Sequence, residues 1–506
     1  MSDSPRQTRG TVYLVGAGPG DPALLTRRAS ELLSTVDVVA YDALITPAIL
    51  TLVNPKAELL SVGYRGYGSS RLKHRMHPEV IDRALKGLNV VRLKSGDPWI
   101  FGRAGHECEE LLENEIPFEV VPGITAALGA AAYAGFPLTH KDLSSDVVLT
   151  SGHDLRGEFH SNSDWNALAR SAGTLAIYMA ATKVRENCDR LMQMGRRPDT
   201  PAAIVAQGTQ GRQRVITGTL TTLPDMVGVL DQKVPAVMMI GETIGLRDKF
   251  RWLERKPLHD LTLLLVRARQ GHSKLAELMR GQGAELIEAP WITTHPLDQY
   301  SELDQAIHNL PRYHNVVFSC EGSVEHFMAR LRMCGRDLRR LREVNFVTVG
   351  SAIVRQLEAC GVTPDIVLTG HCLEAVTAQQ SRLNCGKSLV VTSTRGRHKL
   401  HSFFETLQLA ADFVDAYEYR VQFPNIPAPE VDFVLLPSST SAALLLEGPW
   451  GETLRHRPMV ALGPITQSTA RDHGATQVYR TASDDIKAVL PLLCELKART
   501  RDEAKP

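Results

Sequence analysis

The sequence predicts an α/β protein, because short aliphatic and β-branched runs alternate along the chain with segments of helical character. In the clearest example, Val90, Val91 and Leu93 mark a buried strand, which Gly96-Asp97-Pro98 ends abruptly. Helical character follows over residues 105–112. A strand, a turn without side-chain bulk and a helix with basic groups at its start favour a small-molecule site. An ordinary strand–turn–helix connection explains the segment equally well.

The composition excludes several classes of function. At 506 residues the chain exceeds what one core supports, and we expect about three or four compact units. The 57 basic and 56 acidic side chains nearly balance, so no net field favours nucleic acid or an anionic membrane. No apolar run approaches a membrane span and no signal-peptide core opens the chain, which predicts a cytoplasmic protein. The eight cysteines show no metal-ligand spacing, so we expect reduced thiols and no metal.

The first glycine-rich segment, residues 16–22, follows an expected strand at 11–15 and precedes an expected helix at 24–33. It is a poor dinucleotide fingerprint, because Asp21 stands where the third glycine allows close helix–strand packing. The next expected strand, residues 37–42, ends on Asp42. An acid at a strand end beside a glycine-rich loop is where α/β proteins place catalytic groups, although Asp42 could instead cap the segment after it.

A basic segment occupies residues 63–77. A solvated loop is the commoner outcome for such a charge run. The same charges would also suit a substrate with several carboxylates, because guanidinium groups bind carboxylates through paired hydrogen bonds. Its basic residues are Arg65, Arg71, Lys73, His74, Arg75 and His77.

A second α/β lobe is expected after a helix of small residues that runs to Ala134 and can pack tightly against a sheet or a neighbour. Thr125 and Ala126, at its start, could present backbone N–H groups to a ligand. The charged segment at residues 247–260 marks the expected boundary between two halves. The strands expected before it are residues 147–150, 174–180, 202–206 and 236–241.

Past this boundary the alternation of strands and helices restarts, which predicts parallel sheets. Two internal echoes suggest two similar lobes: residues 347–350 resemble 460–463, and residues 318–320 resemble 437–439. The expected strands are residues 261–266, 316–319, 346–349 and 366–369 in a first set, and 389–392, 413–419, 433–436, 460–463 and 478–482 in a second.

Several motifs of the first half, taken together, resemble uroporphyrinogen-III C-methyltransferase over residues 11–246. They are Val-Gly-Ala-Gly-Pro-Gly-Asp-Pro at 15–22, Tyr41-Asp42, Arg-Leu-Lys-Ser-Gly-Asp-Pro-Trp-Ile-Phe-Gly-Arg at 92–103, Val-Pro-Gly-Ile-Thr-Ala at 121–126, the 134–140 segment, Tyr178-Met179 and Gly208-Thr209.

This resemblance implies two α/β lobes with S-adenosyl-L-methionine folded between them and held largely by backbone groups. Asp42 matches the proposed proton acceptor of the family, Tyr64 stands where the family has its proposed proton donor, and Arg103 joins the catalytic set. The implied cofactor contacts are Pro19, Gly96, Asp97, Ile100, Thr125, Ala126, Met179 and Gly208, and the implied substrate contacts are Arg65, His140 and Lys141.

The departures from the family pattern fall on the substrate side. Ala43 replaces an arginine, Tyr64 a lysine, and His106 an acid, although Glu107 is adjacent; Lys141 replaces an arginine and Ser95 a glycine. Two alternatives therefore stay open. One is a methyltransferase of another tetrapyrrole or precorrin, and the other is a regulatory protein that binds S-adenosyl-L-methionine without catalysis.

The second half resembles uroporphyrinogen-III synthase over about residues 261–496, on Phe318-Ser319, Val349-Gly350, Tyr419-Arg420, Pro437-Ser-Ser and Gly463-Pro-Ile-Thr466. Ile353 departs from a frequent threonine. The resemblance implies cyclisation of hydroxymethylbilane without a cofactor, in a cleft between two lobes. Tyr419 matches the tyrosine suggested to assist departure of the hydroxyl, and plain turn chemistry explains each serine nearly as well. The implied substrate contacts are Arg267, Ser319, Ser438, Ser439 and Thr466.

The sequence thus predicts a bifunctional enzyme that makes uroporphyrinogen III and methylates it to precorrin-2. The expected fold is a tetrapyrrole methylase fold of two α/β lobes, followed by a two-lobed parallel α/β synthase fold. We expect a methyltransferase domain at 11–246, a linker at 247–260 and a synthase-like domain at 261–496. The pathway would supply siroheme, cobalamin or heme d1, and the family resemblance implies a homodimer with tetrapyrrole substrates and no nucleic-acid or membrane partner.

Overall fold

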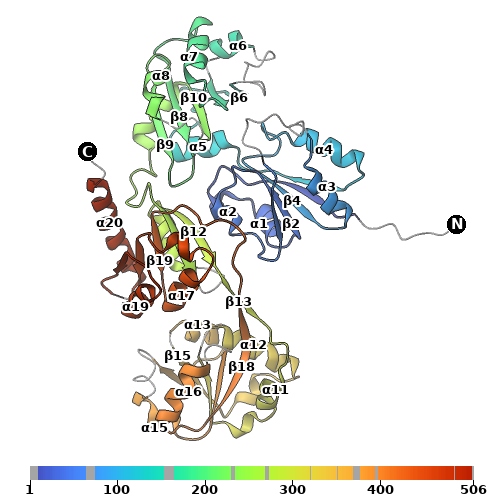
Figure 1. The fold of residues 1–506 in the computed structure, drawn as a ribbon, viewed down its shortest axis with the longest axis vertical. Coiled ribbons are helices and arrows are strands. Elements are labelled where there is room, and N and C mark those ends of the chain that lie inside the picture. The colour runs from blue at the N-terminus through green and yellow to red at the C-terminus, as the bar shows by residue number, and fades with distance from the viewer. Residues whose placement is uncertain are drawn as a thin grey trace, which may run out of the picture. The chain divides into compact units, whose positions relative to one another are not determined.

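The structure of the chain is a computed structural model, and its elements are drawn in Figure 1. It divides into two compact units, the first taking in Met1–Arg267, Gly271–Ala289 and Phe423–Pro506 and the second Pro290–Gln422. The structure describes residues 9–63, 75–152, 164–171, 173–229, 234–267, 273–319, 321–349, 351–368, 377–393, 397–483 and 485–503.

The first sheet is wholly parallel, in the order β3-β2-β4-β1-β5. Val12, Leu14, Val90 and Leu93 are fully buried, because helices cover both faces of a parallel sheet. The strands end level, with Gly16 opposite Lys94 and Tyr41 opposite Leu93, so the loops that follow them leave at one edge. The strands are β1 (Val12–Gly16), β2 (Val38–Tyr41), β3 (Glu58–Ser61), β4 (Val90–Lys94) and β5 (Phe118–Val121).

Two helices of this lobe, α3 (Pro78–Leu85) and α4 (Ala104–Glu113), share one core cluster with β1, β2 and β4. The apolar faces of both helices, including Val80 and Leu111, are fully buried there. The expected strands of this lobe are present, and β3 and β5 are strands that the sequence analysis did not predict. The remaining elements are η1 (Pro22–Leu24), α1 (Arg27–Leu33) and α2 (Pro47–Leu50).

The second sheet is mixed, in the order β6-β7-β10-β8-β9, with only β6 and β7 parallel. Helix α5 (Ala126–Ala134) packs on it through its alanines, as its small residues predict. The strands are β6 (Val147–Ser151), β7 (Thr174–Tyr178), β8 (Pro201–Ala206), the unexpected β9 (Arg214–Thr219) and β10 (Ala236–Ile240), with α6 (Trp165–Arg170), α7 (Val184–Gln193) and α8 (Leu223–Met226) around them.

The third sheet, also in the first unit, has the order β12-β11-β19-β20-β21. Strands β11, β19, β20 and β21 are parallel neighbours. A short helix, α9 (Arg247–Phe250), lies in the segment expected to be a linker. The strands are β11 (Thr262–Arg267), β12 (Glu285–Pro290), β19 (Phe433–Leu436), β20 (Met459–Ala461) and β21 (Val478–Arg480), with α10 (Lys274–Gly281), α17 (Ser439–Glu447), α18 (Gly451–Leu454), α19 (Pro464–Asp472) and α20 (Val489–Glu503).

The second unit holds the fourth sheet, in the order β13-β18-β17-β14-β15-β16, which is parallel apart from the antiparallel pair β13 and β18. Its strands are β13 (Ile292–His295), β14 (Asn315–Phe318), β15 (Asn345–Val349), β16 (Ile366–Leu368), β17 (Ser388–Ser393) and β18 (Ala411–Val421), with α11 (Ser301–His308), α12 (Glu321–Met333), α13 (Ser351–Ala359), α15 (Gln380–Leu383) and α16 (Arg397–Thr406).

The two lobes of the second half are therefore not the two consecutive sets of strands that the internal echoes suggested. The chain begins one sheet with β11 and β12, builds the whole second unit, and then returns to complete the first sheet with β19, β20 and β21. Each echo pairs a strand of one sheet with a strand of the other, because all of them precede a turn and a helix in a parallel sheet.

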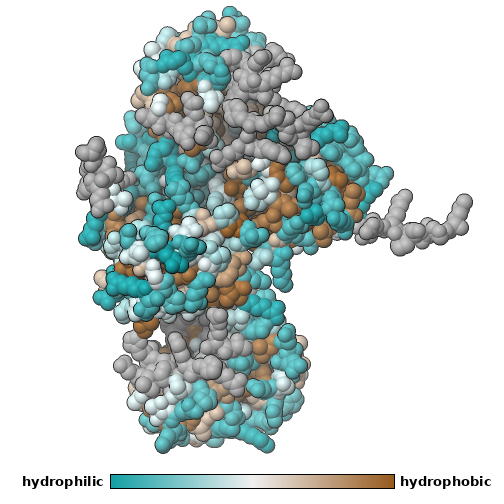
Figure 2. All heavy atoms as spheres, in the orientation of Figure 1, coloured by the Kyte–Doolittle hydropathy of each residue, from teal (hydrophilic) through white to brown (hydrophobic). Residues whose placement is uncertain are grey.

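The surface in Figure 2 is mainly hydrophilic, with apolar side chains scattered among polar ones. Among the described residues, no helix has both the length and the apolar character that crossing a membrane would need. The same residues include no cluster of three or more His, Cys, Asp or Glu side chains placed to hold a metal ion.

Candidate functional site

The candidate site begins where two glycine-containing loops meet at the carboxyl edge of the first sheet. Gly18 and Gly96 form an isolated bridge, with Gly96 N–H donating to Gly18 O at 2.8 Å and Gly18 N–H donating to Gly96 O at 3.1 Å. Both residues have φ of +71°, a left-handed conformation that favours glycine. The loop after β1 and the turn after β4 therefore present backbone, not side chains, at this edge.

The carboxylate of Asp97 organises these loops. Its Oδ1 accepts the backbone N–H groups of Trp99 at 2.8 Å and Ile100 at 3.1 Å, and its Oδ2 accepts the N–H of Gly123 at 3.0 Å. The side chain is buried, so these three bonds fix the turn after β4 to the loop before α5. Asp97, one of the predicted cofactor contacts, therefore shapes the backbone around the site. Its carboxylate is occupied by these three hydrogen bonds.

Thr125 and Ala126, at the start of α5, are joined to the end of β7 by Tyr178. The Tyr178 hydroxyl accepts the N–H of Ala127 at 3.0 Å and lies 2.6 Å from the Thr125 hydroxyl. Burial raises the pKa of Tyr178, although its bonds to Thr125 and Ala127 lower it in part. The Phe101 ring lies 4.8 Å from the Tyr178 ring, so the turn after β4 also contacts this tyrosine.

The remaining cofactor candidates lie against the same helix. Pro19 packs on α5 so closely that a Cβ on Gly129 would lie 2.4 Å from its ring, and a Cβ on Gly208 would lie 2.9 Å from Ala130. Met179 has a left-handed backbone and a half-exposed side chain. Together with the partly exposed Ile100, it gives the site an apolar surface. The structure therefore brings all eight cofactor candidates onto one connected set of loops.

Asp42 lies directly after β2, and a buried arginine holds it. The Arg92 guanidinium donates from Nη2 to Asp42 Oδ1 at 2.6 Å and from Nε to Glu107 Oε1 at 3.0 Å. Lys94 completes the group by donating to Glu107 Oε2 at 2.7 Å. Burial alone would lower the pKa of Arg92, but the two carboxylates raise it above its ordinary value. Burial, together with repulsion from Arg92, lowers the pKa of Lys94.

Arg92, Lys94 and Glu107 are site residues that the sequence analysis did not nominate. The sequence held a signal for them, because Arg92 and Lys94 are two residues apart in a strand expected to be buried on both faces. Glu107 points inward to these cations, whereas His106 is exposed and faces Glu109 at 3.5 Å. Glu107 therefore does not occupy the place of the acid that His106 replaces.

The other substrate-side candidates lie in turns and at helix ends. Arg103 precedes α4 in a left-handed conformation with φ of 58°. His140 belongs to a turn in which its Nδ1 accepts the N–H of Asp142 at 3.2 Å, and Lys141 is exposed. His77, from the basic segment, caps α3. Tyr64 and Arg65 lie outside the described residues, as do Arg71, Lys73 and His74.

In the third sheet the synthase candidates lie toward one edge, because they stand at the ends of the parallel neighbours β11, β19 and β20. Arg267 is the last residue of β11, Ser438 and Ser439 follow β19, and Thr466 follows β20. Arg267 pairs with Glu288 at 2.6 Å. The Ser438 hydroxyl caps α17 by accepting the Ser441 N–H at 3.2 Å, as turn chemistry alone would explain.

In the fourth sheet, Ser319 follows β14 and Tyr419 lies near the end of β18. The Ser319 hydroxyl donates to Thr392 Oγ1 at 2.9 Å, and the Tyr419 and Tyr417 hydroxyls lie 2.7 Å apart. Tyr417 is buried and stacks on His326 with ring centres 4.9 Å apart. Burial lowers the pKa of His326. Tyr417 and His326 were not predicted as site residues. The spacing of Tyr417 and Tyr419 puts both on one face of β18, whereas only the structure places His326 against Tyr417.

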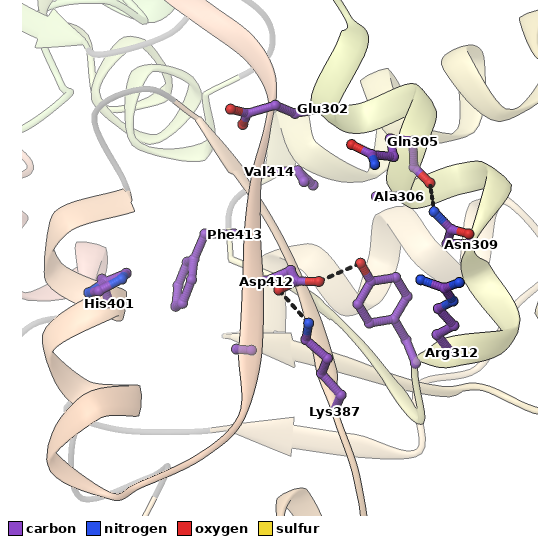
Figure 3. A pocket seen from close by; sticks show the side chains of 12 residues that line it. Glu302, Gln305, Ala306, Asn309, Arg312, Lys387, His401, Asp412, Phe413 and Val414 are labelled. Atoms are coloured by element: carbon purple, nitrogen blue, oxygen red, sulfur yellow. Dashed lines mark hydrogen bonds and ion pairs between the residues drawn. The ribbon is translucent and has the colours of Figure 1, made fainter.

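A cavity of about 470 Å³ in the second unit is separate from these candidates. Figure 3 shows Asp412 in its wall, with Lys387 pointing toward the carboxylate. Asp412 pairs with Lys387 at 2.7 Å and accepts the Tyr313 hydroxyl at 2.7 Å. Tyr313 and Lys387 precede β14 and β17, whereas Ser319 follows β14, so the cavity lies at the opposite, amino edge of the sheet.

Comparison with known proteins divides the chain in two. Residues 11–224 match the family model of tetrapyrrole (corrin/porphyrin) methylases, and residues 273–490 match that of uroporphyrinogen-III synthase HemD. The uroporphyrinogen-III C-methyltransferase of Bacillus subtilis is 31% identical over 486 residues, which are 95% of this chain and 96% of that protein. The porphyrin biosynthesis protein HemD of Ruminiclostridium josui is 36% identical over 361 residues, 70% of each protein.

Other relatives match the first half alone. The siroheme synthase of Pseudomonas putida is 48% identical over 254 residues, 50% of this chain, which spans 54% of that relative. Among solved structures, uroporphyrin-III C-methyl transferase from Thermus thermophilus complexed with S-adenyl homocysteine is 34% identical, with a TM-score of 0.41 over 47% of this chain and 100% of that one. A mutant uroporphyrinogen III synthase, also from Thermus thermophilus, is 15% identical, with a TM-score of 0.34 over 47% of this chain and 99% of that one.

Proposed function

The chain belongs to the tetrapyrrole methylase family through its first half and to the uroporphyrinogen-III synthase family through its second half, and from this we propose a bifunctional enzyme of tetrapyrrole biosynthesis. Its synthase half converts hydroxymethylbilane to uroporphyrinogen III, and its methyltransferase half methylates uroporphyrinogen III to precorrin-2. The observation that carries the proposal is Asp42, held by Arg92 at the sheet edge where the cofactor candidates converge.

These residues fit S-adenosyl-L-methionine. The bridged loops at Gly18 and Gly96 offer backbone groups, and Ile100 and Met179 offer apolar surface to an adenosyl group. The cofactor supplies an electrophilic methyl group when it is bound. Pro19, Gly96, Asp97, Ile100, Thr125, Ala126, Met179 and Gly208 position it, the last of these by close packing on α5.

Asp42 acts on the substrate side. A ring carbon that had gained a methyl group would leave the substrate with a proton to lose, and the Asp42 carboxylate would accept that proton. The side chains of Arg103, His140 and Lys141, with Tyr64 and Arg65, contact the tetrapyrrole and its carboxylates. Ala43 and His106 depart from the family pattern on the substrate side of the site, so the alternative substrate is another tetrapyrrole.

In the synthase half, Tyr419 assists departure of the hydroxyl from hydroxymethylbilane. The neighbouring Tyr417 hydroxyl, 2.7 Å away, can relay a proton to it. Arg267, Ser319, Ser438, Ser439 and Thr466 bind the carboxylate arms of the substrate. We place the domain boundaries at 11–246 and 261–496, and we expect a cytoplasmic homodimer, which light scattering on the purified protein tests.

The experiment combines purified protein, hydroxymethylbilane and S-adenosyl-L-methionine without oxygen and follows the products by absorbance and mass. A dimethylated type-III product is expected. Unmethylated type-III product would support the synthase assignment alone. The methyltransferase half would then act on another substrate or bind the cofactor without catalysis. A methylated type-I product would remove the synthase assignment. Asp42→Asn should abolish methyl transfer while leaving cofactor binding intact.

A further inference from the structure

Strand β4 carries two buried cations, which a strand covered on both faces can tolerate only if both are paired. Arg92 and Lys94 are two residues apart and therefore point to the same face. On that face α4 supplies one buried carboxylate, Glu107, which binds both cations through different oxygens at 3.0 and 2.7 Å. Asp42 supplies the second carboxylate, so two positive and two negative groups balance.

The four side chains differ in their access to solvent. The exposed fractions are 4% for Lys94, 7% for Arg92, 9% for Glu107 and 27% for Asp42, so Asp42 is the open end of the group. The Arg92 guanidinium is fixed in three directions, by Asp42, by Glu107 and by the Leu93 carbonyl at 3.2 Å. Its orientation toward Asp42 thus depends on Glu107, whose side chain is buried.

We propose that Glu107 is a positioning residue for methyl transfer: acting through Arg92, it fixes the direction of the Asp42 carboxylate. The proposal rests on the proposed role of Asp42 as proton acceptor. The Arg92 guanidinium binds both carboxylates, so removal of the Glu107 carboxylate frees its Nε side to turn away from the direction in which it holds Asp42. Removal of Arg92 takes away the donor that binds Asp42 Oδ1.

Two further titratable groups lie at this network among the described residues. Lys94 on β4 binds Glu107, and Cys108 follows Glu107 on α4. Burial raises the pKa of the Cys108 thiol, which keeps it neutral. The raised pKa of Arg92 agrees with a guanidinium held between two carboxylates.

The test compares Glu107→Gln, Arg92→Gln and the control Glu113→Gln, which changes an exposed acid on the same helix. The measurements are kcat and KM of methyl transfer. We expect kcat to fall about 10-fold or more in Glu107→Gln and in Arg92→Gln. KM should stay within about 2-fold, because a turned carboxylate affects the reaction step and not substrate binding. The control should match the wild type. S-adenosylhomocysteine affinity should stay within about 2-fold in all three variants and show that the cofactor loops remain folded.

A fall in kcat with unchanged KM and unchanged cofactor affinity is the outcome that a merely structural role would not produce. An unchanged kcat, or a rise in KM together with weaker S-adenosylhomocysteine binding, would overturn the proposal while leaving the proposed function intact. If the wild type transfers no methyl group, the proposed function fails, and the direction of Arg92 is then read from crystal structures of the wild type and Glu107→Gln. An Arg92 guanidinium that keeps the same contact with Asp42 in Glu107→Gln would refute the positioning role.

Discussion

Replacing Asp97 with asparagine should weaken cofactor binding although the new side chain has the same size. The carboxylate accepts three backbone N–H groups, two from its own turn and one from Gly123. An asparagine can keep its oxygen toward Trp99 and Ile100, but its NH₂ group then faces the Gly123 N–H, so one bond is lost and two donors are opposed. A hydrogen bond to a charged group contributes about 1.5–3 kcal/mol.

The lost hydrogen bond is the one that joins the turn after β4 to the loop before α5, and both segments carry cofactor candidates. If the loops must be joined for binding, the cost appears in the binding equilibrium as about a 10- to 150-fold rise in the Kd for S-adenosylhomocysteine. Isothermal titration calorimetry measures this Kd. Asp189→Asn on α7 is the matched control, because α7 packs in a different core cluster from α5. Unchanged affinity in Asp97→Asn would refute the view that Asp97 acts by joining the loops.

Three further changes test other parts of the two candidate sites. Tyr178→Phe keeps the ring near Phe101 but removes the hydroxyl that accepts the Ala127 N–H. Titration calorimetry should find about 5- to 10-fold weaker S-adenosylhomocysteine binding. Equal affinity would show that this hydroxyl does not organise the loops. Gly96→Ala should lower the free energy of unfolding in urea by about 1–2 kcal/mol. The cost comes from its left-handed backbone alone, because a Cβ there would meet its nearest neighbour at 3.6 Å, an ordinary contact distance. Gly245→Ala is the control, and an equal effect in both variants would contradict the reasoning. Tyr419→Phe should slow enzymatic ring closure about 100-fold or more, seen as a higher ratio of spontaneous type-I to type-III product, and an unchanged ratio would remove Tyr419 from the mechanism.

Local patterns predicted the parts of the fold in which neighbours in sequence are also neighbours in space. The β1 and β4 strands and the turns after them follow from aliphatic runs that end in glycine, proline or aspartate. The insertion of the whole second unit between β12 and β19 left no such local signal, because which strand pairs with which depends on long-range packing. The edge strands β3, β5, β9, β12 and β13 were missed, since pairing with the sheet, more than the local pattern, defines an edge strand.

The site shows the same division. Asp42 was found because an acid at a strand end is a local feature, and the motif residues around Gly96 were found by resemblance. Glu107 was not found, because its role depends on two cations that come from a different element. Yet one inference was within reach of the sequence. Two cations two residues apart in a buried parallel strand require carboxylates from elsewhere. A strand-end acid and a following helix rich in acids are the nearest sources in this chain. That rule would have joined Asp42 to Arg92 from the sequence alone.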